Sequence, residues 1–451
     1  MSRRSIPYLL AAVLCALYCA VSVPRQLRFE TYGFDLGIFE QGVRGYAALG
    51  PPVSTLKGTG FNLLGDHFSP VLALLAPVYR LFPGAVTLLV AQAVLIAVSV
   101  VPVTRLAIEV SGRVGGTLLG TAYGLSWGLW AALEFDFHEV AFAVPLAAFA
   151  VEALARDRAV AAACWALPLL LVKEDQGLLV AGVGVYLMAR RHRRLGAAVV
   201  VTAVLVTAVV VLLVIPANHP DGRYAYADAG EWDGGDPLSR LLLPGTKWWT
   251  VLALLAPTGY LALRSPLVLL AVAPLAARFW AVNPLYWGTR YHYSAVLMPV
   301  LFLAFADGLR RIGRWYAGWL RLAVPVLALL VAAVALPVPP PGPAGLRVTE
   351  ARQVLAVVPD GARVAASNEL AAQLTGRCTV SLFPRLTPPG TSGPWARPVA
   401  EWVAVLDRRD EGGGDSSPAS VEERSAVAGL PAAGYREAAS GGGITVYRWA
   451  G

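Results

Sequence analysis

The sequence predicts an all-α polytopic membrane protein that ends in a small α/β domain. Of its 451 residues, 57% are hydrophobic and only 15% are charged, whereas a soluble globular chain carries about 25% charged residues. Apolar stretches of the length that crosses a bilayer core, about 20 residues, recur along positions 1–338. After residue 345 the pattern changes to short apolar runs separated by glycine, proline and polar residues, which is typical of strands and turns.

The apolar stretches predict about eleven membrane-spanning segments. The first also has the basic start and apolar core of a signal peptide, but we expect it to be retained as a span. Several stretches are short for a full crossing, so we expect the segments between 140 and 189 to be tilted or partly re-entrant. The expected cores are 6–23, 84–104, 114–133, 140–155, 159–172, 176–189, 195–216, 248–263, 266–282, 292–307 and 320–338.

The basic residues predict the orientation of these segments. Cytoplasmic loops collect lysine and arginine, and with Arg3 and Arg4 inside, nearly every dense basic loop falls on the cytoplasmic side. The net charge of +8 is therefore a topology signal, and no basic face for nucleic acid is seen. We expect a multi-pass cell-membrane protein with a cytoplasmic N-terminus and an extracytoplasmic C-terminal domain. The basic loops hold Arg105 and Arg113, Arg156 and Arg158, residues 190–194, Arg264, and residues 310–321.

The first outer loop, residues 25–83, contains two expected helices. Residues 35–48 have apolar side chains at helical spacing and end near a Gly-Pro-Pro break. The stretch 68–82 is apolar but contains Pro70 and Pro77, so we expect a helix that lies on the membrane or dips into it. A second outer loop, 217–247, is long enough to serve in binding or as a lid.

The chain therefore divides into a transmembrane domain, 1–338, a stiff proline-rich linker, 339–345, and an outer domain, 346–451. We expect the outer domain to hold a helix near 348–358, strands at 362–366 and 401–408, a loop at 410–420 and a hairpin over 435–449.

Four charged clusters interrupt the apolar chain, and the topology places all of them on the outer side. They are Asp35 in GFDLGIFEQ, Asp66-His67 in NLLGDHFSP, Asp136 to Glu139 in EFDFHEV, and Lys173-Glu174-Asp175 in LLVKEDQG. Ionisable groups near membrane depth cost roughly 2.5 kcal/mol or more each, so they usually serve a function and face a cavity. The clusters predict a site built at the outer membrane surface.

The first two clusters each allow two interpretations. Asp35 could accept a proton or bind a metal, or it could cap the helix that follows it. Asp66 and His67, adjacent in a tight turn, could bind a divalent cation or a phosphate, or they could cap a helix.

The third and fourth clusters also allow two interpretations each. Asp136, His138 and Glu139 offer the ligands that hard cations and transition metals prefer, or they form a solvated turn. Lys173, Glu174 and Asp175 form either a salt-bridged plug facing a cavity or a purely structural ion pair.

Arg290 and His292, in LYWGTRYHYSA, begin a span on the same outer side. An arginine binds phosphate in a bidentate manner, so Arg290 is a candidate contact to a lipid phosphate, with interfacial anchoring as the alternative.

The four motifs, in this order and spacing, resemble DUF2079, a family of bacterial and archaeal polytopic membrane proteins. The resemblance covers residues 30–190, and PDGARVAASNELAAQLTGR and EWVAVLD resemble the C-terminal part of that family. The family is similar to the GT-C superfamily of membrane glycosyltransferases, which implies a GT-C-like core and sugar transfer from a polyprenyl-phosphate donor in the cell envelope. Asp35 matches the superfamily's acidic residue in the first outer loop, although Glu40 follows it where a close second aspartate is common.

The resemblance implies that Asp35 is the general base and that the other charged residues contact a lipid-linked sugar donor or an extracytoplasmic acceptor. A divalent cation, Mg or Mn, could be held by Asp66, His67, Asp136 and His138. The alternatives are a transporter or flippase for a lipid-linked or anionic substrate, and a non-catalytic scaffold. The expected substrate-binding residues are Glu40, Gln41, Asp66, His67, Asp136, His138, Glu139, Lys173, Glu174, Asp175, Arg290 and His292.

Overall fold

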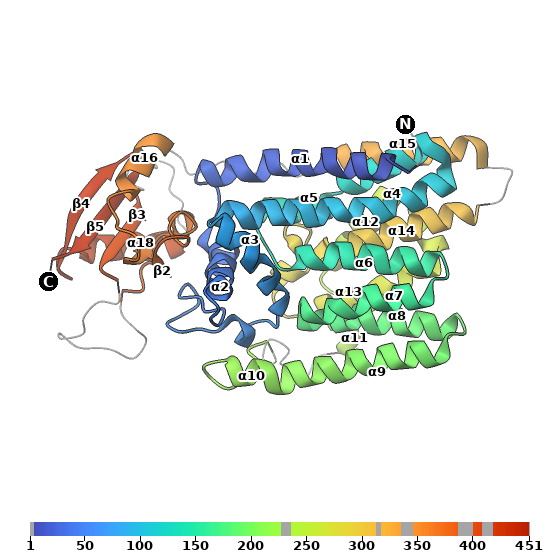
Figure 1. Cartoon of the computed structure of the whole chain (residues 1–451), viewed down its shortest axis with the longest axis horizontal. Coiled ribbons are helices and arrows are strands. Elements are labelled where there is room, and N and C mark those ends of the chain that lie inside the picture. Colours follow the sequence, from blue (N-terminus) through green and yellow to red (C-terminus); the bar gives the residue numbers. More distant parts are fainter. Residues whose placement is uncertain are drawn as a thin grey trace. The chain divides into compact units, whose positions relative to one another are not determined.

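The computed structural model describes residues 4–226, 236–312, 317–334, 346–386, 400–407 and 418–450 (Figure 1). The chain forms two compact units, which we describe separately. The first, the helical unit, comprises residues 1–20, 63–72 and 91–338, and the second, the sheet unit, comprises residues 21–62, 73–90 and 339–451. The predicted linker 339–345 and residues 410–417 of the predicted loop lie outside the described residues.

The helical unit is an array of helices joined by short turns, with several turns of 3₁₀ helix between them (Figure 1). Neighbouring helices in the sequence pack against each other, as in α6 with α7 and α8 with α9. The helices are α1 (Ile6–Leu27), α4 (Ala85–Gly124), α5 (Trp127–Glu134), α6 (Val140–Ala155), α7 (Ala159–Ala166), α8 (Gly177–Ala189), α9 (Arg193–Val209), α10 (Ile215–Asn218), α11 (Pro237–Leu242), α12 (Thr246–Leu255), α13 (Val272–Trp280), α14 (Leu297–Arg310) and α15 (Ala317–Val334); α1 and α4 each extend into the sheet unit.

Helix α4 reverses direction at Gly112, which has φ 73° and ψ −177°, a conformation that glycine adopts without strain. Beyond this turn Gly116 lies against Ile108, where an added Cβ would come within 2.4 Å of the Ile108 backbone, and Gly120 lies against Thr104. The two arms therefore form a tight antiparallel hairpin. The separate spans predicted at 84–104 and 114–133 correspond to these arms.

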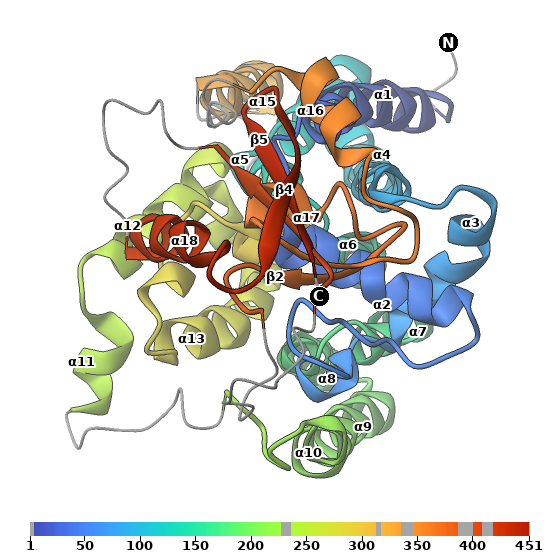
Figure 2. The same cartoon turned by 90° about the vertical axis from the view of Figure 1, so that its left-hand side faces the viewer.

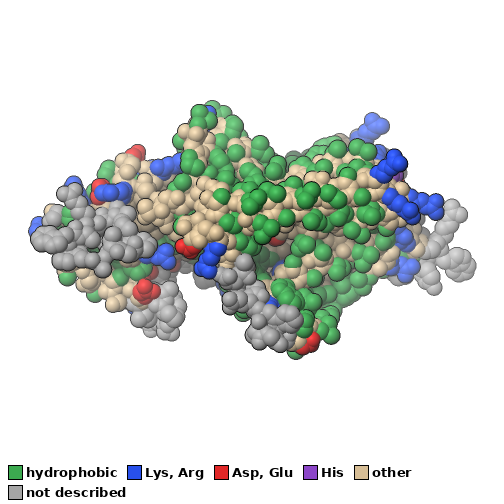
Figure 3. Space-filling model, turned by 90° about the horizontal axis from the view of Figure 1, so that it is seen from below, with side chains coloured by type: hydrophobic (Ala, Val, Ile, Leu, Met, Phe, Trp, Pro, Cys, Tyr) green, Lys and Arg blue, Asp and Glu red, His purple; other side chains and the backbone are tan. Residues whose placement is uncertain are grey.

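The sides of the helical unit are apolar, as a lipid-facing surface requires. Among the described residues four helical segments are long and apolar enough to cross a membrane: Ile6–Leu27, Ala85–Glu134, Arg193–Asn218 and His292–Arg310. The last of these is the centre of the unit, with 94% of its apolar window buried, against 22% for Arg193–Asn218. Figure 3 shows hydrophobic side chains covering much of this surface.

The prediction of about eleven full spans is not confirmed. The expected span 248–263 breaks into α12 and two short 3₁₀ turns, with Gly259 and Tyr260 both at positive φ between them. The expected span 266–282 begins as a 3₁₀ turn, Pro266–Ala271, before α13. Proline lacks the amide hydrogen that a continuous helix needs, so these segments are shorter than the apolar pattern suggests.

The basic loops gather at one end of the helical unit (Figure 3). Arg156 pairs with Glu109 at 2.7 Å and Arg190 with Asp157 at 2.8 Å, and the guanidinium of Arg310 donates to the Ala155 carbonyl at 2.9 Å. The loops predicted to face the cytoplasm therefore share one end of the bundle, as the topology requires.

The sheet unit contains a five-stranded sheet in the order β2-β1-β3-β5-β4 within its described residues. β1 pairs in parallel with β2 and β3, while β5 pairs in antiparallel with β3 and β4. Helix α16 packs against β4 and β5, and α17 against β1, β2 and β3 (Figure 2). The elements are α2 (Ile38–Ala47), α3 (Ala76–Leu81), α16 (Val348–Leu355), β1 (Arg363–Ala366), α17 (Asn368–Ala371), β2 (Thr379–Leu382), β3 (Trp402–Leu406), α18 (Pro418–Gly429), β4 (Tyr435–Gly441) and β5 (Ile444–Trp449).

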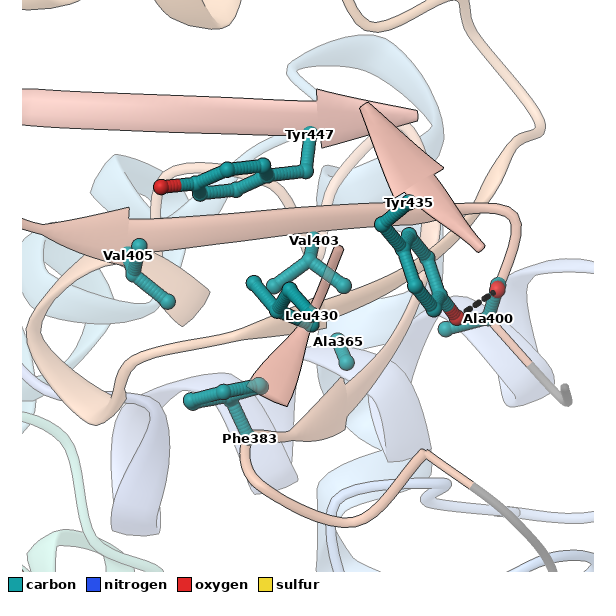
Figure 4. Close-up of a cluster of buried hydrophobic side chains, with 8 residues drawn as sticks. All are labelled: Ala365, Phe383, Ala400, Val403, Val405, Leu430, Tyr435 and Tyr447. Atoms are coloured by element: carbon teal, nitrogen blue, oxygen red, sulfur yellow. Dashed lines mark hydrogen bonds between the residues drawn. The ribbon is translucent and has the colours of Figure 1, made fainter. Parts of the chain in front are cut away.

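The core beside this sheet is apolar, and it includes the hydrogen-bonded hydroxyl of Tyr435 (Figure 4). The Tyr435 hydroxyl donates to the Ala400 carbonyl at 2.7 Å, so the buried polar group is satisfied. The helix, both strands and the hairpin predicted for this domain are confirmed, whereas β2, α17 and α18 were not predicted. The buried cluster consists of Ala365, Phe383, Ala400, Val403, Val405, Leu430, Tyr435 and Tyr447.

Candidate functional site

At the end of the helical unit opposite the basic loops, polar side chains from five separate segments contact one another. We call this set the polar cluster. It joins three of the four charged motifs, the start of the α14 span and the loop after α10. Its members are Asp66, His67, His138, Glu139, Lys173, Glu174, Tyr224, Tyr226 and His292.

One half of the polar cluster centres on Glu174, in the turn before α8. Its Oε1 lies 2.7 Å from Nδ1 of His67, and its Oε2 accepts the Phe68 amide hydrogen at 3.0 Å. The Tyr224 hydroxyl donates to Oε1 at 3.2 Å. The Glu174 carboxylate is thus paired and hydrogen-bonded, as a buried charge must be.

The other half centres on Glu139, which immediately precedes α6 and is completely buried. Its Oε1 lies 3.1 Å from Nζ of Lys173, and its Oε2 lies 2.8 Å from Nδ1 of His138. The ring of His138 stacks on that of His292, with 3.6 Å between centroids. Since Lys173 and Glu174 are adjacent in the chain, the two halves form one connected network.

Tyr226 covers the first half of the cluster. Its ring stacks on His67 at a centroid distance of 4.6 Å, and its hydroxyl donates to Oδ1 of Asp66 at 3.1 Å. Sequence reasoning missed both Tyr224 and Tyr226. The alternation in RYAYAD, which places both rings on one side of an extended segment, is the signal that could have identified them.

Two uncharged residues, Gly65 and Gln92, position the cluster. Gly65 lies against the end of α10, where an added Cβ would meet the Asn218 backbone at 2.5 Å, so only glycine lets the Asp66-His67 turn approach. Gln92 accepts the His138 amide hydrogen at 3.0 Å and donates to the carbonyls of Ala132 and Asp136. A lone glutamine within an apolar span was the available sequence signal for this role.

The turn from 135 to 139 is buried, so the alternative of a solvated turn is wrong. Asp136, His138 and Glu139 have exposed fractions of 2%, 5% and 0%. Asp136 has φ 67°, a conformation uncommon for a residue other than glycine. Such backbone costs about 1–3 kcal/mol and concentrates at functional sites.

The pairing fixes the charges of the cluster. Burial and Lys173 lower the pKa of His67, but the Glu174 carboxylate outweighs them and the net shift is upward. Burial raises the pKa of Glu174, yet His67 and Lys173 bring it down to about 2. Despite burial, Glu139 holds the pKa of Lys173 well above its usual range, and His138 and Lys173 hold that of Glu139 well below. The cluster therefore keeps a buried ammonium and two carboxylates charged.

The metal site predicted from Asp66, His67, Asp136 and His138 does not fit this geometry. The Lys173 ammonium stands between the two halves, so a cation held by both histidines would lie beside a fixed positive charge. In the described part of the chain, no group of three or more His, Cys, Asp and Glu side chains is arranged to hold a metal ion. We derive no step through a metal.

Two further predicted residues lie at the edge of the cluster. Asp175 is exposed and accepts a hydrogen bond from Nε2 of Gln176 at 2.9 Å. Arg290 is exposed, with its guanidinium 5.8 Å from the centre of the Tyr291 ring, which suits either a headgroup contact or an interfacial anchor.

Asp35 belongs to the sheet unit, so the structure does not describe it together with the polar cluster. It is half-buried and has φ 66° and ψ −76°, close to the rare and strained γ-turn of positive φ. Gly37, which precedes α2, has helical backbone angles, and the capping role considered for Asp35 stays a prediction. A strained, partly accessible carboxylate fits a chemical role.

Glu40 and Gln41 make their hydrogen bonds within the sheet unit. Glu40 accepts from the hydroxyls of Tyr79, at 3.0 Å, and Thr375, and burial raises its pKa to about 7 against these donors. Gln41 donates to the Val380 carbonyl at 3.0 Å and accepts from the Ser54 hydroxyl at 2.7 Å. Both residues have a clear role in the fold, and substrate binding by them stays a prediction.

Comparison with known proteins gives one assignment. A family described as "Predicted membrane protein (DUF2079)" matches residues 25–411. A search of curated proteins found no match. The match covers most of the chain, including the motifs around Asp35, His67, His138 and Lys173. It agrees with the apolar helices of the helical unit. The chain is therefore a multi-pass membrane protein that belongs to the DUF2079 family.

Proposed function

We propose that this protein is an integral membrane glycosyltransferase that moves a sugar from a polyprenyl-phosphate donor to an extracytoplasmic acceptor. The observation that supports it best is the polar cluster, in which Lys173, His67 and His138 are paired with carboxylates at one end of an apolar helical unit. In this reaction the bond between the sugar and the phosphate oxygen breaks, and the lipid phosphate leaves with the electron pair. Fixed positive charge in a dry site stabilises that departing anion.

Lys173 and His67 would supply the positive charge. Their paired carboxylates favour the protonated form of both groups, since each pKa is shifted upward. An ammonium has three donors, so a phosphate oxygen can join Lys173 without displacing Glu139. In His67 the Glu174 carboxylate faces Nδ1, and we assign Nε2 of that ring to the substrate, as in other carboxylate–histidine pairs.

Asp35 would take the proton of the acceptor hydroxyl as the new bond to the sugar forms. This role comes from the family resemblance, and its support in the structure is the strained turn of the sheet unit. The proposal uses no metal, and activity in the presence of EDTA, compared with added Mg or Mn, tests that choice.

The test compares extracytoplasmic glycans from cells that carry the wild type or one of several variants. We expect Lys173→Gln, His67→Asn and Asp35→Asn each to reduce the glycan product at least tenfold, a loss of about 1.4 kcal/mol or more in transition-state stabilisation. Arg190→Gln, at the exposed pair with Asp157 on the opposite end of the helical unit, is the matched control and should leave the product unchanged. Unchanged glycans in all three folded, membrane-inserted site variants would refute the enzyme and favour a scaffold.

A transporter or flippase is the second candidate, because linked acidic, basic and histidine side chains also form proton relays in transporters. Reconstitution in liposomes separates the two. A transporter moves lipid-linked substrate across the bilayer with no acceptor present, whereas the enzyme releases polyprenyl phosphate only when acceptor is added.

A further inference from the structure

In the sheet unit, the segment that follows β1 is fitted closely around the turn that carries Asp35. Oδ1 of Asn368 accepts the Phe34 amide hydrogen at 2.8 Å. Gly33 packs so closely that an added Cβ would lie 2.5 Å from Cβ of Ala371 and 3.3 Å from the Asn368 carbonyl oxygen. The residue before Asp35 is thus held by a side chain more than 300 positions away in the sequence.

The turn needs such a hold because its backbone is unfavourable. Asp35 has φ 66° and ψ −76°, and a conformation of this kind persists only where surrounding structure imposes it. On its other side the chain enters α2, where Gly37 lies against Leu56 and Thr375. Both flanks of Asp35 are therefore fixed by contacts, and Asn368 provides a side-chain hydrogen bond to the residue before it.

The position of Asn368 in the sheet gives this contact a further meaning. The parallel strands lie in the order β2-β1-β3. After β1 the chain continues to β2 on one side of β1, and after β2 it crosses to form β3 on the other side. In open α/β sheets, ligands bind at the carboxyl ends of the strands where the order reverses. Ser367 and Asn368 directly follow β1 at this point, and here Asn368 contacts the turn that carries Asp35.

We propose that Asn368 is a positioning residue for Asp35. In this proposal residues 367–370, with the sequence SNEL, hold the turn that carries Asp35 in its reactive conformation. The inference rests on the proposed function, in which Asp35 is the base. The inference gives a function to the motif PDGARVAASNELAAQLTGR, which contributes no residue to the polar cluster.

The first test measures glycosyl product for three variants. We expect Asn368→Ala to lower the product on the order of tenfold, since a small misplacement of a reacting group is costly. Asn368→Asp keeps an acceptor for the Phe34 amide and should restore most of the product. Gln373→Ala is the matched control: Nε2 of Gln373 also binds a first-loop carbonyl, that of Gln26, at 2.9 Å, but away from the turn, so its product should not change.

The double variant Asp35→Asn/Asn368→Ala decides whether Asn368 acts through Asp35. If it does, the double variant loses no more than Asp35→Asn alone; multiplied losses would overturn the inference. A full product from folded Asn368→Ala, with Asp35→Asn inactive, would overturn the inference and leave the proposed function intact. A full product from Asp35→Asn would overturn the inference and the assignment of Asp35 as the base.

A second measurement needs no activity. Hydrogen exchange of the Phe34 amide should be about fivefold faster in Asn368→Ala, because a neutral hydrogen bond contributes about 1 kcal/mol, and unchanged in Gln373→Ala. Should Asn368→Ala not fold, Asn368→Ser, whose hydroxyl is too short to reach the amide, takes its place. Equal exchange in wild type and variant would show that Asn368 does not order the turn.

Discussion

The pair between Lys173 and Glu139 gives the sharpest test of the polar cluster. The charged atoms are 3.1 Å apart and the carboxylate is completely buried, so their attraction is about 5 kcal/mol at an effective dielectric constant of about 20. Lys173→Met removes the ammonium and leaves a buried carboxylate with the neighbouring His138. Breaking such a pair costs about 3–5 kcal/mol, and we expect a loss of that size in unfolding free energy.

The assay is thermal and denaturant unfolding of purified protein in detergent, run as a cycle with Glu139→Gln and the double variant. Because the double variant has no unpaired charge, it should be more stable than Lys173→Met by about 2 kcal/mol or more. Arg190→Met, at an exposed pair, is the control and should cost about 0–1 kcal/mol.

The pH dependence gives a second check. In the wild type the pKa of Glu139 is far below its usual range, so the pair's contribution is present above the ordinary carboxyl pKa and is lost as pH falls through the folded-state value. Without Lys173 the buried carboxyl prefers its neutral form, and the variant should recover stability as pH falls. Equal stability of Lys173→Met and wild type at neutral pH would refute the reasoning.

Three further predictions concern the other half of the cluster. The pKa of His67 is raised and that of Glu174 is about 2, so their pair stabilises the fold most between about pH 4.5 and 6.5. Stability should decline as pH rises through the folded-state pKa of His67. In melting temperatures measured across this pH range, His67→Asn should remove that decline. Gly65→Ala should lower the melting temperature and expression, since its Cβ would meet Asn218 at 2.5 Å; a variant as stable as wild type would contradict the close approach. Tyr226→Phe removes the hydrogen bond to Asp66 but keeps the ring stack, so it should cost about 1 kcal/mol and less than Tyr226→Leu, compared by denaturant unfolding.

The convergence of the motifs that contain His67, His138 and Lys173 could be predicted from the cost of isolating a charged group in an apolar environment. Ionisable side chains in an apolar chain must pair with one another or with water, and a strict alternation of spans puts the loops with His67, His138 and Lys173 at the same end. The structure finds the pairs His67–Glu174 and Lys173–Glu139. The sequence alone could not give the pairing itself, since any of several carboxylates could have met Lys173.

The place of Asp35 could not be predicted, because it depends on contacts distant in sequence. The first outer loop is divided: residues 63–72 belong to the helical unit, and residues 21–62 to the sheet unit. What binds the second part there is a set of specific bonds to the tail, such as Gln41 to Val380 and Phe34 to Asn368. Neither hydrophobic period nor charge pattern reports such bonds.

The breaks within two expected spans could not be predicted, for a different reason. Apolar composition indicates burial or lipid contact, but it does not show whether the backbone stays helical. Pro257 and Pro266 fall within expected spans, and each stands at the start of a 3₁₀ turn.

The charge state of the polar cluster is what separates the two candidate functions. In glycosyl transfer, Lys173 and His67 must stay protonated through the reaction, and the carboxylates that raise their pKa values serve that need. In proton-coupled transport, a histidine of the cluster must gain and lose a proton in every cycle, and a strong pair such as His67–Glu174 opposes the loss. Product formed in detergent, where no proton gradient exists, would therefore favour the enzyme, whereas activity that needs a sealed vesicle and a pH gradient would favour the transporter.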